Sequence, residues 1–222
     1  MAETGLYDDF LKVVKNRRSV RYLKPDSIPE GYVNKIIEAA RWAPSGFHTQ
    51  PWEFVVIRKK EIRDKIAGIL EPPITPDGVQ PQCQAAPVFI IVLQDWRARI
   101  GLPEQAQKSE EMVKNIYCSS MASAFLLMQL AAAALGLSAR WYSSVSSPKT
   151  QQRIKDIIGF PDGLTIYDMM CVGYPEKPPI PKIVRETKDM VHYDDCGPAD
   201  FRTKKQVETY ARKTYNWCLA AH

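Results

Sequence analysis

The chain has 222 residues, 45% of them hydrophobic and 25% charged, which is enough to bury the core of one domain. The formal net charge is +5, but Lys and Arg are spread along the chain, so small anionic ligands suit it better than nucleic acid. Five widely spaced cysteines exclude a disulfide framework and a zinc ribbon, and residues 1–9 lack a signal peptide's apolar stretch, so we expect a cytoplasmic protein.

Helices and strands alternate in the first part of the chain. Apolar residues recur at helical spacing over residues 6–15 and 33–40, which predicts two helices, the second of them ended by Pro44. Residues 52–57 are aromatic and β-branched and predict a strand, and residues 59–70 predict a helix.

The middle of the chain contains the strongest strand and the longest helix. Four prolines in residues 71–84 indicate a surface loop, and the continuous apolar run at 88–93 predicts a strand covered on both faces. Ser109 is a suitable N-cap for a long helix that is apolar nearly all round from Met121 to Leu137. Since this run is shorter than the roughly 20 residues of a membrane span, we expect a buried helix that faces a second subunit, and no membrane partner.

Three further elements are predicted: a strand at 138–145, a helix at 151–158 and a strand at 165–172. Residues 177–182 carry three prolines and must be extended, and residues 203–219 predict a polar terminal helix. We expect one domain over residues 1–222, whose segment from about 177 to 222 packs on a partner subunit.

A cluster of basic side chains lies where the first helix ends. This arginine segment, residues 17–21, places three guanidiniums and a hydroxyl within five residues, and bidentate guanidinium forks hold phosphate well. The alternative is a solvated basic helix end whose arginines satisfy the last carbonyl groups of the helix.

A second segment, residues 43–52, has the composition of a tight exposed turn, and we name it the ligand loop. Pro44 restricts the backbone, Gly46 permits close approach, and Ser45, His48 and their neighbours offer hydrogen-bond donors. His48 has an alternative as a hydrogen-bonded turn histidine. The sequence therefore predicts a ligand-binding loop at a helix C-terminus.

Together the two segments resemble the N-terminal flavin motifs of the FMN-dependent nitroreductase family, and the resemblance continues through Gly173-Tyr174-Pro175 and Arg185 to about residue 193. His48 followed by Thr49 is similar to the iodotyrosine deiodinase branch. The resemblance implies an α+β fold with a mixed sheet flanked by helices, in an intertwined homodimer.

The same resemblance implies noncovalently bound FMN between the subunits, with NAD(P)H as electron donor. The implied activity is ping-pong hydride transfer to small planar acceptors such as nitroaromatics and quinones. A reductive dehalogenase or another specialised flavin reductase is one alternative, and a flavin-binding protein without catalysis is another. No catalytic side chain can be named from the sequence.

The resemblance also assigns residues. Arg17, Ser19 and Arg185 would hold the phosphate, Arg18 would serve the ribityl and phosphate region, and Arg21 would lie at the flavin N1/O2 edge. Backbone and hydroxyl groups of residues 142–144 would approach N5 and O4, although Ser143 could equally belong to an ordinary strand end. The implied FMN-binding residues are Arg17, Arg18, Ser19, Arg21, Pro44, Ser45, Gly46, Phe47, His48, Tyr142, Ser143, Ser144 and Arg185.

Several common sequence motifs are absent from the chain. The chain has no Gly-x-Gly-x-x-Gly, Walker or Gly-x-Ser-x-Gly motif, which removes the main support for Rossmann, kinase and triad-hydrolase folds. The spacing of residues 192–196 fits no metal site, and we expect Cys118 and Cys171 to be core residues. The loop at 71–84 lacks the Tyr and Lys with which deiodinases clamp an amino acid, so flat, weakly charged acceptors are expected.

Overall fold

The computed structural model describes residues 4–70, 83–178 and 180–220. The chain divides into two compact units, Met1–Lys177 and Pro178–His222. The expectation of one domain over the whole chain therefore stays a prediction.

The first unit is built on a four-stranded sheet with the order β1-β2-β4-β3. The strands are β1 (Trp52–Ile57), β2 (Val88–Asp95), β3 (Ser138–Tyr142) and β4 (Leu164–Gly173), and all three neighbouring pairs are antiparallel. Among the described residues, the parallel pairing of the expected mixed sheet is limited to the isolated bridge between Ser19 and Ala139. The predicted α+β class with a helix-flanked sheet is confirmed.

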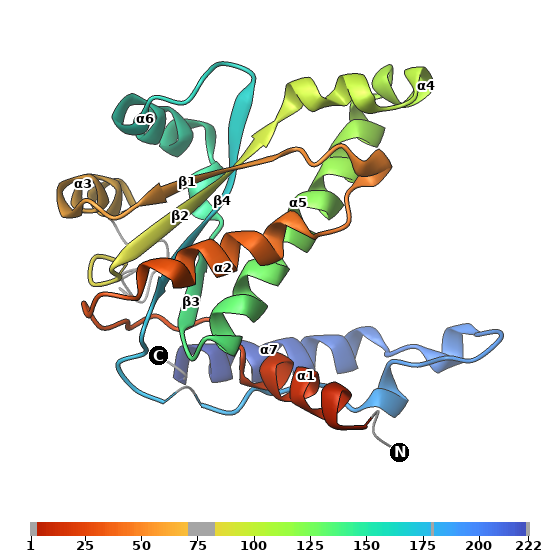
Figure 1. Cartoon of the computed structure of the whole chain (residues 1–222). Coiled ribbons are helices and arrows are strands. Elements are labelled where there is room, and N and C mark those ends of the chain that lie inside the picture. The colour runs from red at the N-terminus through yellow and green to blue at the C-terminus, as the bar shows by residue number, and fades with distance from the viewer. Residues whose placement is uncertain (1–3, 71–82, 179, 221–222) are drawn as a thin grey trace. The chain divides into compact units, whose positions relative to one another are not determined.

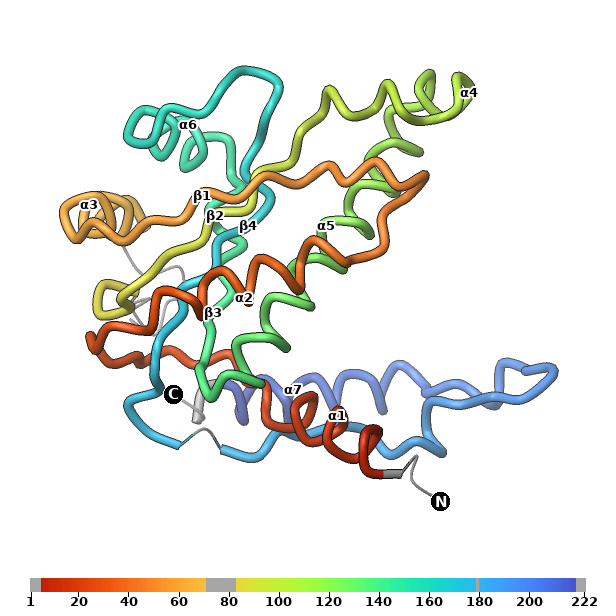
Figure 2. The backbone as a smooth tube through the Cα atoms, viewed as in Figure 1, coloured from red at the N-terminus to blue at the C-terminus, as the bar shows by residue number. Residues whose placement is uncertain are grey.

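Helices cover both faces of this sheet (Figure 1). The longer helices of the first unit are α1 (Thr4–Asn16), α2 (Glu30–Arg41), α3 (Lys60–Leu70), α5 (Glu110–Ala134) and α6 (Pro148–Ile158), with the short α4 (Glu104–Gln107) before α5. Figure 2 shows α2 running alongside α5, while α3 and α6 pack together on the other face of the sheet.

Both faces of strand β2 pack in hydrophobic clusters. Its residues alternate between the faces: Ile91 joins the cluster under α3 and α6, and Ile90 joins the cluster under α2 and α5. Because both faces are covered, the period-2 polar pattern of a half-exposed strand is absent, as the continuous apolar run predicts.

Two element boundaries differ from the sequence prediction. Strand β3 ends at Tyr142, because Ser143 adopts helical dihedral angles and starts the 3-10 turn Ser144–Ser146. Helix α6 begins earlier than expected, since the Ser147 side chain caps it and Pro148 occupies its first position. The predicted N-cap of α5 is confirmed, with Ser109 Oγ accepting from the Met112 amide at 3.2 Å.

Within one chain helix α5 is buried on one face, and the expected burial of its other face against a second subunit stays a prediction. Its outer face is exposed or half-buried and consists of Met112, Ser119, Ala122, Ser123, Leu126, Leu130 and Ala133. Leu126 is 47% exposed, and Cys118 is also exposed, so Cys118 is not the core residue that was expected, whereas Cys171 is. By length and composition α5 is the one described helix that could span a membrane, but its other face packs in the core.

The second unit contains α7 (Lys204–Ala220) and the short turns Thr187–Asp189 and Pro198–Asp200. Trp217 Nε1 donates to the carbonyl oxygen of Pro181 at 3.1 Å, and His192 stacks against Phe201 with ring centroids 4.7 Å apart. The Trp217 hydrogen bond joins the terminal helix to the proline-led segment inside this unit.

Candidate functional site

The arginine segment runs along the edge of the sheet. The Val20 amide donates to the carbonyl oxygen of Ala139 at 3.1 Å, and the Lys24 amide donates to that of Tyr174 at 2.8 Å. Ser19 therefore lies beside Ala139, about 10 Å of strand before Tyr142. The structure thus brings the arginine segment close to the end of β3.

The neighbouring residues Arg17 and Arg18 make hydrogen bonds to different partners. Arg18 donates to the carbonyl oxygens of Lys15 and Arg17, which is the contact expected for a basic helix end. Arg17 is half-buried, and its Nη1 donates to Gln129 Oε1 on α5 at 3.1 Å. Burial, followed by the charge of Arg18, lowers the pKa of Arg17 from its ordinary value. The Arg17 guanidinium is thus held against α5, whereas that of Arg18 bonds to carbonyl groups at the end of the first helix.

Gln129 adds a buried hydrogen-bond donor beside Arg17. Its side chain is only 4% exposed, and its Nε2 finds no hydrogen-bond partner among the described residues. A buried donor without an acceptor costs about 1–3 kcal/mol, which an anionic or carbonyl group of a ligand would offset. The pair of Arg17 and Gln129 therefore fits an anionic ligand group.

The ligand loop has a strained backbone. Phe47, His48 and Gln50 are not glycines, yet their φ angles are +52°, +56° and +45°. Such conformations are uncommon for residues with a Cβ and cluster at functional sites. Inside the loop, Ser45 Oγ accepts from the Gln50 amide at 3.0 Å, which closes the turn.

Gly46 fastens the ligand loop to α5. Its amide donates to Ser120 Oγ at 3.1 Å, and a Cβ added to Gly46 would lie 2.3 Å from Ile116 Cγ2. Phe47 follows with a side chain that is 62% exposed. The loop backbone is therefore pressed on the helix while Phe47 faces outward.

His48 is exposed and contacts Gln50, with 2.9 Å between His48 Nε2 and Gln50 Nε2. The Gln50 amide nitrogen can only donate, so His48 Nε2 accepts and the ring proton lies on Nδ1. The alternative of a hydrogen-bonded turn histidine is compatible with this contact, and the outward Nδ1–H remains a donor for a ligand.

The three residues at the end of β3 are not equivalent. The Tyr142 side chain is buried in the core under the Arg140 guanidinium, 4.5 Å from the ring centroid, and burial raises the pKa of its hydroxyl. The expected hydroxyl contact from Tyr142 is therefore wrong, and only its backbone can face a ligand. Ser143 is exposed and Ser144 is half-buried. Their hydroxyl groups stay available.

The ligand loop and the arginine segment are kept apart within one chain by α5. Gln129 follows Ser120 by nine residues, which is about 14 Å along the helix axis and about half a turn around it. The loop contact and the Arg17 contact thus border opposite edges of the outer face of α5. One chain alone does not bring the two segments together.

Arg185 belongs to the second unit. Its guanidinium donates to the carbonyl oxygen of Asp189. It lines a pocket of about 300 Å³ together with Asp189, Met190, His192, Asp200, Phe201, Arg202 and Val207. Arginine and aspartate are equally frequent in this lining, so the pocket has no clear preference for an anion.

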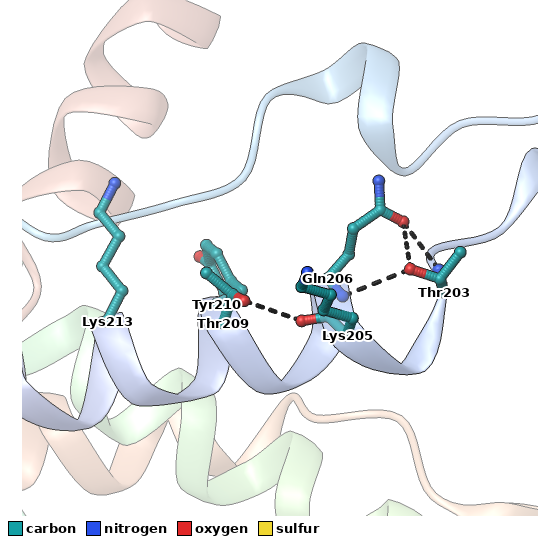
Figure 3. Close-up of a pocket in the computed structure, with 6 residues that line it drawn as sticks. All are labelled: Thr203, Lys205, Gln206, Thr209, Tyr210 and Lys213. Atoms are coloured by element: carbon teal, nitrogen blue, oxygen red, sulfur yellow. Dashed lines mark hydrogen bonds between the residues drawn. The ribbon is translucent and has the colours of Figure 1, made fainter.

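A second hollow of about 460 Å³ follows α7, and Figure 3 shows its lining residues spaced along this one helix. They are Thr203, Lys205, Gln206, Thr209, Tyr210 and Lys213. Thr203 and Gln206 bond to one another, and Thr209 Oγ1 donates to the Lys205 carbonyl oxygen at 2.8 Å. Nowhere in the described part of the chain do three His, Cys, Asp or Glu side chains form a metal site.

Known proteins that are similar to this chain indicate its family. A model described as "Nitroreductase family" matches residues 14–174. The chain belongs to the nitroreductase family. The matched range holds the arginine segment, the ligand loop and residues 142–144, whereas Arg185 lies beyond it.

Three similar proteins illustrate the nitroreductase relationship. A Methanothermobacter thermautotrophicus protein provisionally named NADH dehydrogenase/NAD(P)H nitroreductase is 29% identical over 77% of this chain and 80% of its own length. An iodotyrosine deiodinase of Hydra vulgaris is 27% identical over 77% of this chain, which spans 66% of that protein. The structure of an NADPH:FMN oxidoreductase from Vibrio harveyi complexed with NAD+ has the same fold, with a TM-score of 0.73 at 17% identity over 94% of this chain and 86% of that one.

Two residues that contact the ligand loop and the arginine segment were missed by sequence reasoning. Ser120 and Gln129 lie in an apolar helix, and their contacts join them to Gly46 and Arg17, far away in the sequence. Polar residues inside an otherwise apolar helix were the available signal, because a buried polar group needs a partner.

A buried carboxylate supports the end of β3. Trp141 Nε1 donates to Asp168 Oδ2 at 2.5 Å, and the indole stacks on Phe125 with centroids 4.3 Å apart. Burial raises the pKa of Asp168 to about 6, and the indole hydrogen bond acts in the opposite direction. Asp168 therefore titrates in a range where unfolded aspartates are already ionised.

We expect Asp168→Asn to change how stability depends on pH. Because its pKa is raised in the folded state, the contribution of Asp168 to stability is most favourable below about pH 4 and is lost as the pH rises through about 6. The variant lacks this loss, so its free energy of unfolding relative to wild type should rise by about 1–3 kcal/mol between pH 4 and pH 7. Urea unfolding across this range measures it, and parallel curves for the two proteins would contradict the assignment.

Proposed function

We propose that this nitroreductase-family protein is an FMN-dependent oxidoreductase that uses NAD(P)H to reduce small planar acceptors. The observation that carries the proposal is the pairing of a strained ligand loop with the Arg17–Gln129 anion site on opposite edges of one helix face. Bound FMN would supply the hydride chemistry. The names of the Methanothermobacter and Vibrio relatives support both the flavin and the nicotinamide donor.

The residues fit an FMN in several places. Arg17, with Ser19 beside it, would hold the phosphate, and Gln129 offers a buried donor to the same group. Ser143 and Ser144 would donate to the edge of the ring from the end of β3. Phe47 and His48 would cover it, and His48 Nδ1–H would donate to it.

The site requires a second copy of the chain, which we propose as the homodimer partner. The ligand loop of one copy must reach the arginine segment of the other across the outer face of α5, because α5 separates the two within a chain. Apolar side chains on α1 support this, with Leu6 82% and Phe10 55% exposed. Packing of Pro178–His222 on the partner, and a cytoplasmic location, belong to the same proposal.

Two measurements on purified protein test the function. Stoichiometric bound FMN and bleaching of its absorbance by NADH or NADPH without oxygen are the expected results. Bound FMN that neither donor bleaches would favour a flavin-binding protein without catalysis. Absence of FMN binding would contradict the proposal as a whole.

Arg21 is proposed to lie at the N1/O2 edge of the flavin, where negative charge builds up on reduction. A fixed cation there stabilises the reduced form, so Arg21→Gln should lower the two-electron midpoint potential and alter FMN affinity less. Spectroelectrochemical titration measures the potential. An unchanged or higher value would remove Arg21 from this role.

The acceptor is the least constrained part of the proposal, and the similarity to iodotyrosine deiodinases keeps reductive dehalogenation as a second candidate. The expected absence of an amino-acid clamp depends on residues 71–84, of which 71–82 lie outside the described residues. We expect higher kcat/KM for a nitroaromatic and a quinone than for diiodotyrosine under anaerobic conditions. A tenfold preference for diiodotyrosine would favour the dehalogenase.

A further inference from the structure

Ser120 is a buried polar residue in an otherwise apolar part of α5. It is only 2% exposed, and its hydroxyl makes two hydrogen bonds. Ser120 Oγ donates to the Ile116 carbonyl oxygen at 2.6 Å and accepts from the Gly46 amide at 3.1 Å. Because its one proton is committed to the helix, the oxygen lone pair is directed to the ligand loop.

The fit between loop and helix is also tight. A Cβ added to Gly46 would lie 2.3 Å from Ile116 Cγ2, so the loop backbone packs directly against the Ile116 side chain and leaves no room for a methyl group. The hydrogen bond and this contact act at the same residue. Together they locate Gly46, which directly precedes the two left-handed residues Phe47 and His48.

Among the described residues, the other hydrogen bonds within residues 45–50 are internal to the loop, and the next residue is fixed to β2, where the Pro51 carbonyl oxygen accepts from the Asp95 amide at 2.8 Å. Ser45 Oγ accepts from the Gln50 amide, and Thr49 Oγ1 donates to the Gly46 carbonyl oxygen at 2.9 Å. Such bonds shape the turn but do not fix its place on the protein. Placement on α5 therefore depends on Ser120 and Ile116, and strained dihedral angles persist only where surroundings determine them.

We propose that Ser120 is a positioning residue, which holds the ligand loop in its strained conformation and so aims Phe47 and His48 at the flavin. This inference rests on the proposed function. Removing the hydroxyl leaves the Gly46 amide without its acceptor, and the loop then relaxes toward ordinary dihedral angles. Ser120 itself does not touch the flavin.

The first test needs no flavin. Amide hydrogen exchange of the apoprotein, followed by NMR, should show Gly46 exchanging about three- to tenfold faster in Ser120→Ala than in wild type, the range expected for one neutral hydrogen bond. The control is Ser123→Ala, which removes a hydroxyl on the same helix that donates to the Ser119 carbonyl oxygen at 2.8 Å and not to the loop. It should leave Gly46 exchange unchanged.

The second test measures FMN affinity by titration of apoprotein. Ser120→Ala should bind FMN about three- to tenfold more weakly, whereas Gln152→Ala, which removes an exposed hydrogen bond to Asp156 within α6, should bind it as wild type does. Wild-type exchange at Gly46 in Ser120→Ala would overturn the proposal. Faster exchange with unchanged FMN affinity would overturn it too, because the loop position would then be irrelevant to the flavin.

These outcomes are separable from failure of the proposed function. If the wild-type protein bound no FMN, the flavin role of Ser120 would fall together with that function. The exchange rates would still decide whether Ser120 holds the loop.

Discussion

Replacing Arg17 with alanine is expected to weaken FMN binding tenfold or more. The change removes a charge-assisted contact to a phosphate dianion, which is worth about 1.5–3 kcal/mol. It also leaves buried Gln129 without the donor that Arg17 Nη1 provides to its Oε1. Isothermal titration of the apoprotein with FMN measures the effect. The family resemblance of the sequence also assigns Arg185 to the phosphate, so Arg185→Ala is expected to behave in the same way.

Arg41→Ala is the matched control for these two variants. It also removes one guanidinium. Arg41 is exposed, pairs with Glu38 on the surface of α2 and lies outside both the arginine segment and the ligand loop. An exposed pair contributes little to stability, about 0–1 kcal/mol, so FMN affinity should equal that of wild type. Wild-type affinity in both Arg17→Ala and Arg185→Ala would show that the phosphate is held elsewhere.

Replacing Gly46 with alanine is expected to destabilise the protein by about 1–3 kcal/mol through overpacking. Gly46 is not among the glycines with positive φ, so its backbone would accept an alanine. The obstacle is the Ile116 side chain, with its Cγ2 at 2.3 Å from the added Cβ. The free energy of unfolding from urea denaturation measures the loss.

A double-mutant cycle with Ile116→Ala isolates this contact. The second change removes Cγ2 and Cγ1 and leaves the Ile116 Cβ at 3.5 Å, an ordinary contact. The double variant should therefore be more stable than the sum of the single effects predicts, by about 1 kcal/mol or more. Additive effects would show that Gly46 and Ile116 are not in contact.

Gly68→Ala serves as the control for the glycine change itself. A Cβ at Gly68 meets nothing within 4 Å, and the residue lies inside α3. There alanine should stabilise the helix by up to about 1 kcal/mol, because glycine loses more backbone freedom on folding. Opposite signs at Gly46 and Gly68 would separate crowding from backbone entropy.

Local sequence patterns were sufficient to predict most elements of the fold. The apolar run of β2 has a hydrophobic residue at every position because both faces of the strand are covered, and Ser109 marks the start of α5 because its side chain caps it. The arginine segment and the ligand loop are also contiguous in sequence, so their residue types alone suggested an anion and a ligand site. The nitroreductase family follows from the same segments.

The tertiary structure decided how these segments are used. Arg17 and Gln129 are 112 residues apart and Gly46 and Ser120 are 74 apart, and no local pattern encodes such pairs. The register of β3 places the Tyr142 side chain in the core, and the turn that follows the strand leaves Ser143 exposed and Ser144 half-buried. Which face of α5 is covered depends on the packing of α2 and the sheet, because a helix that is apolar all round does not itself specify a buried side.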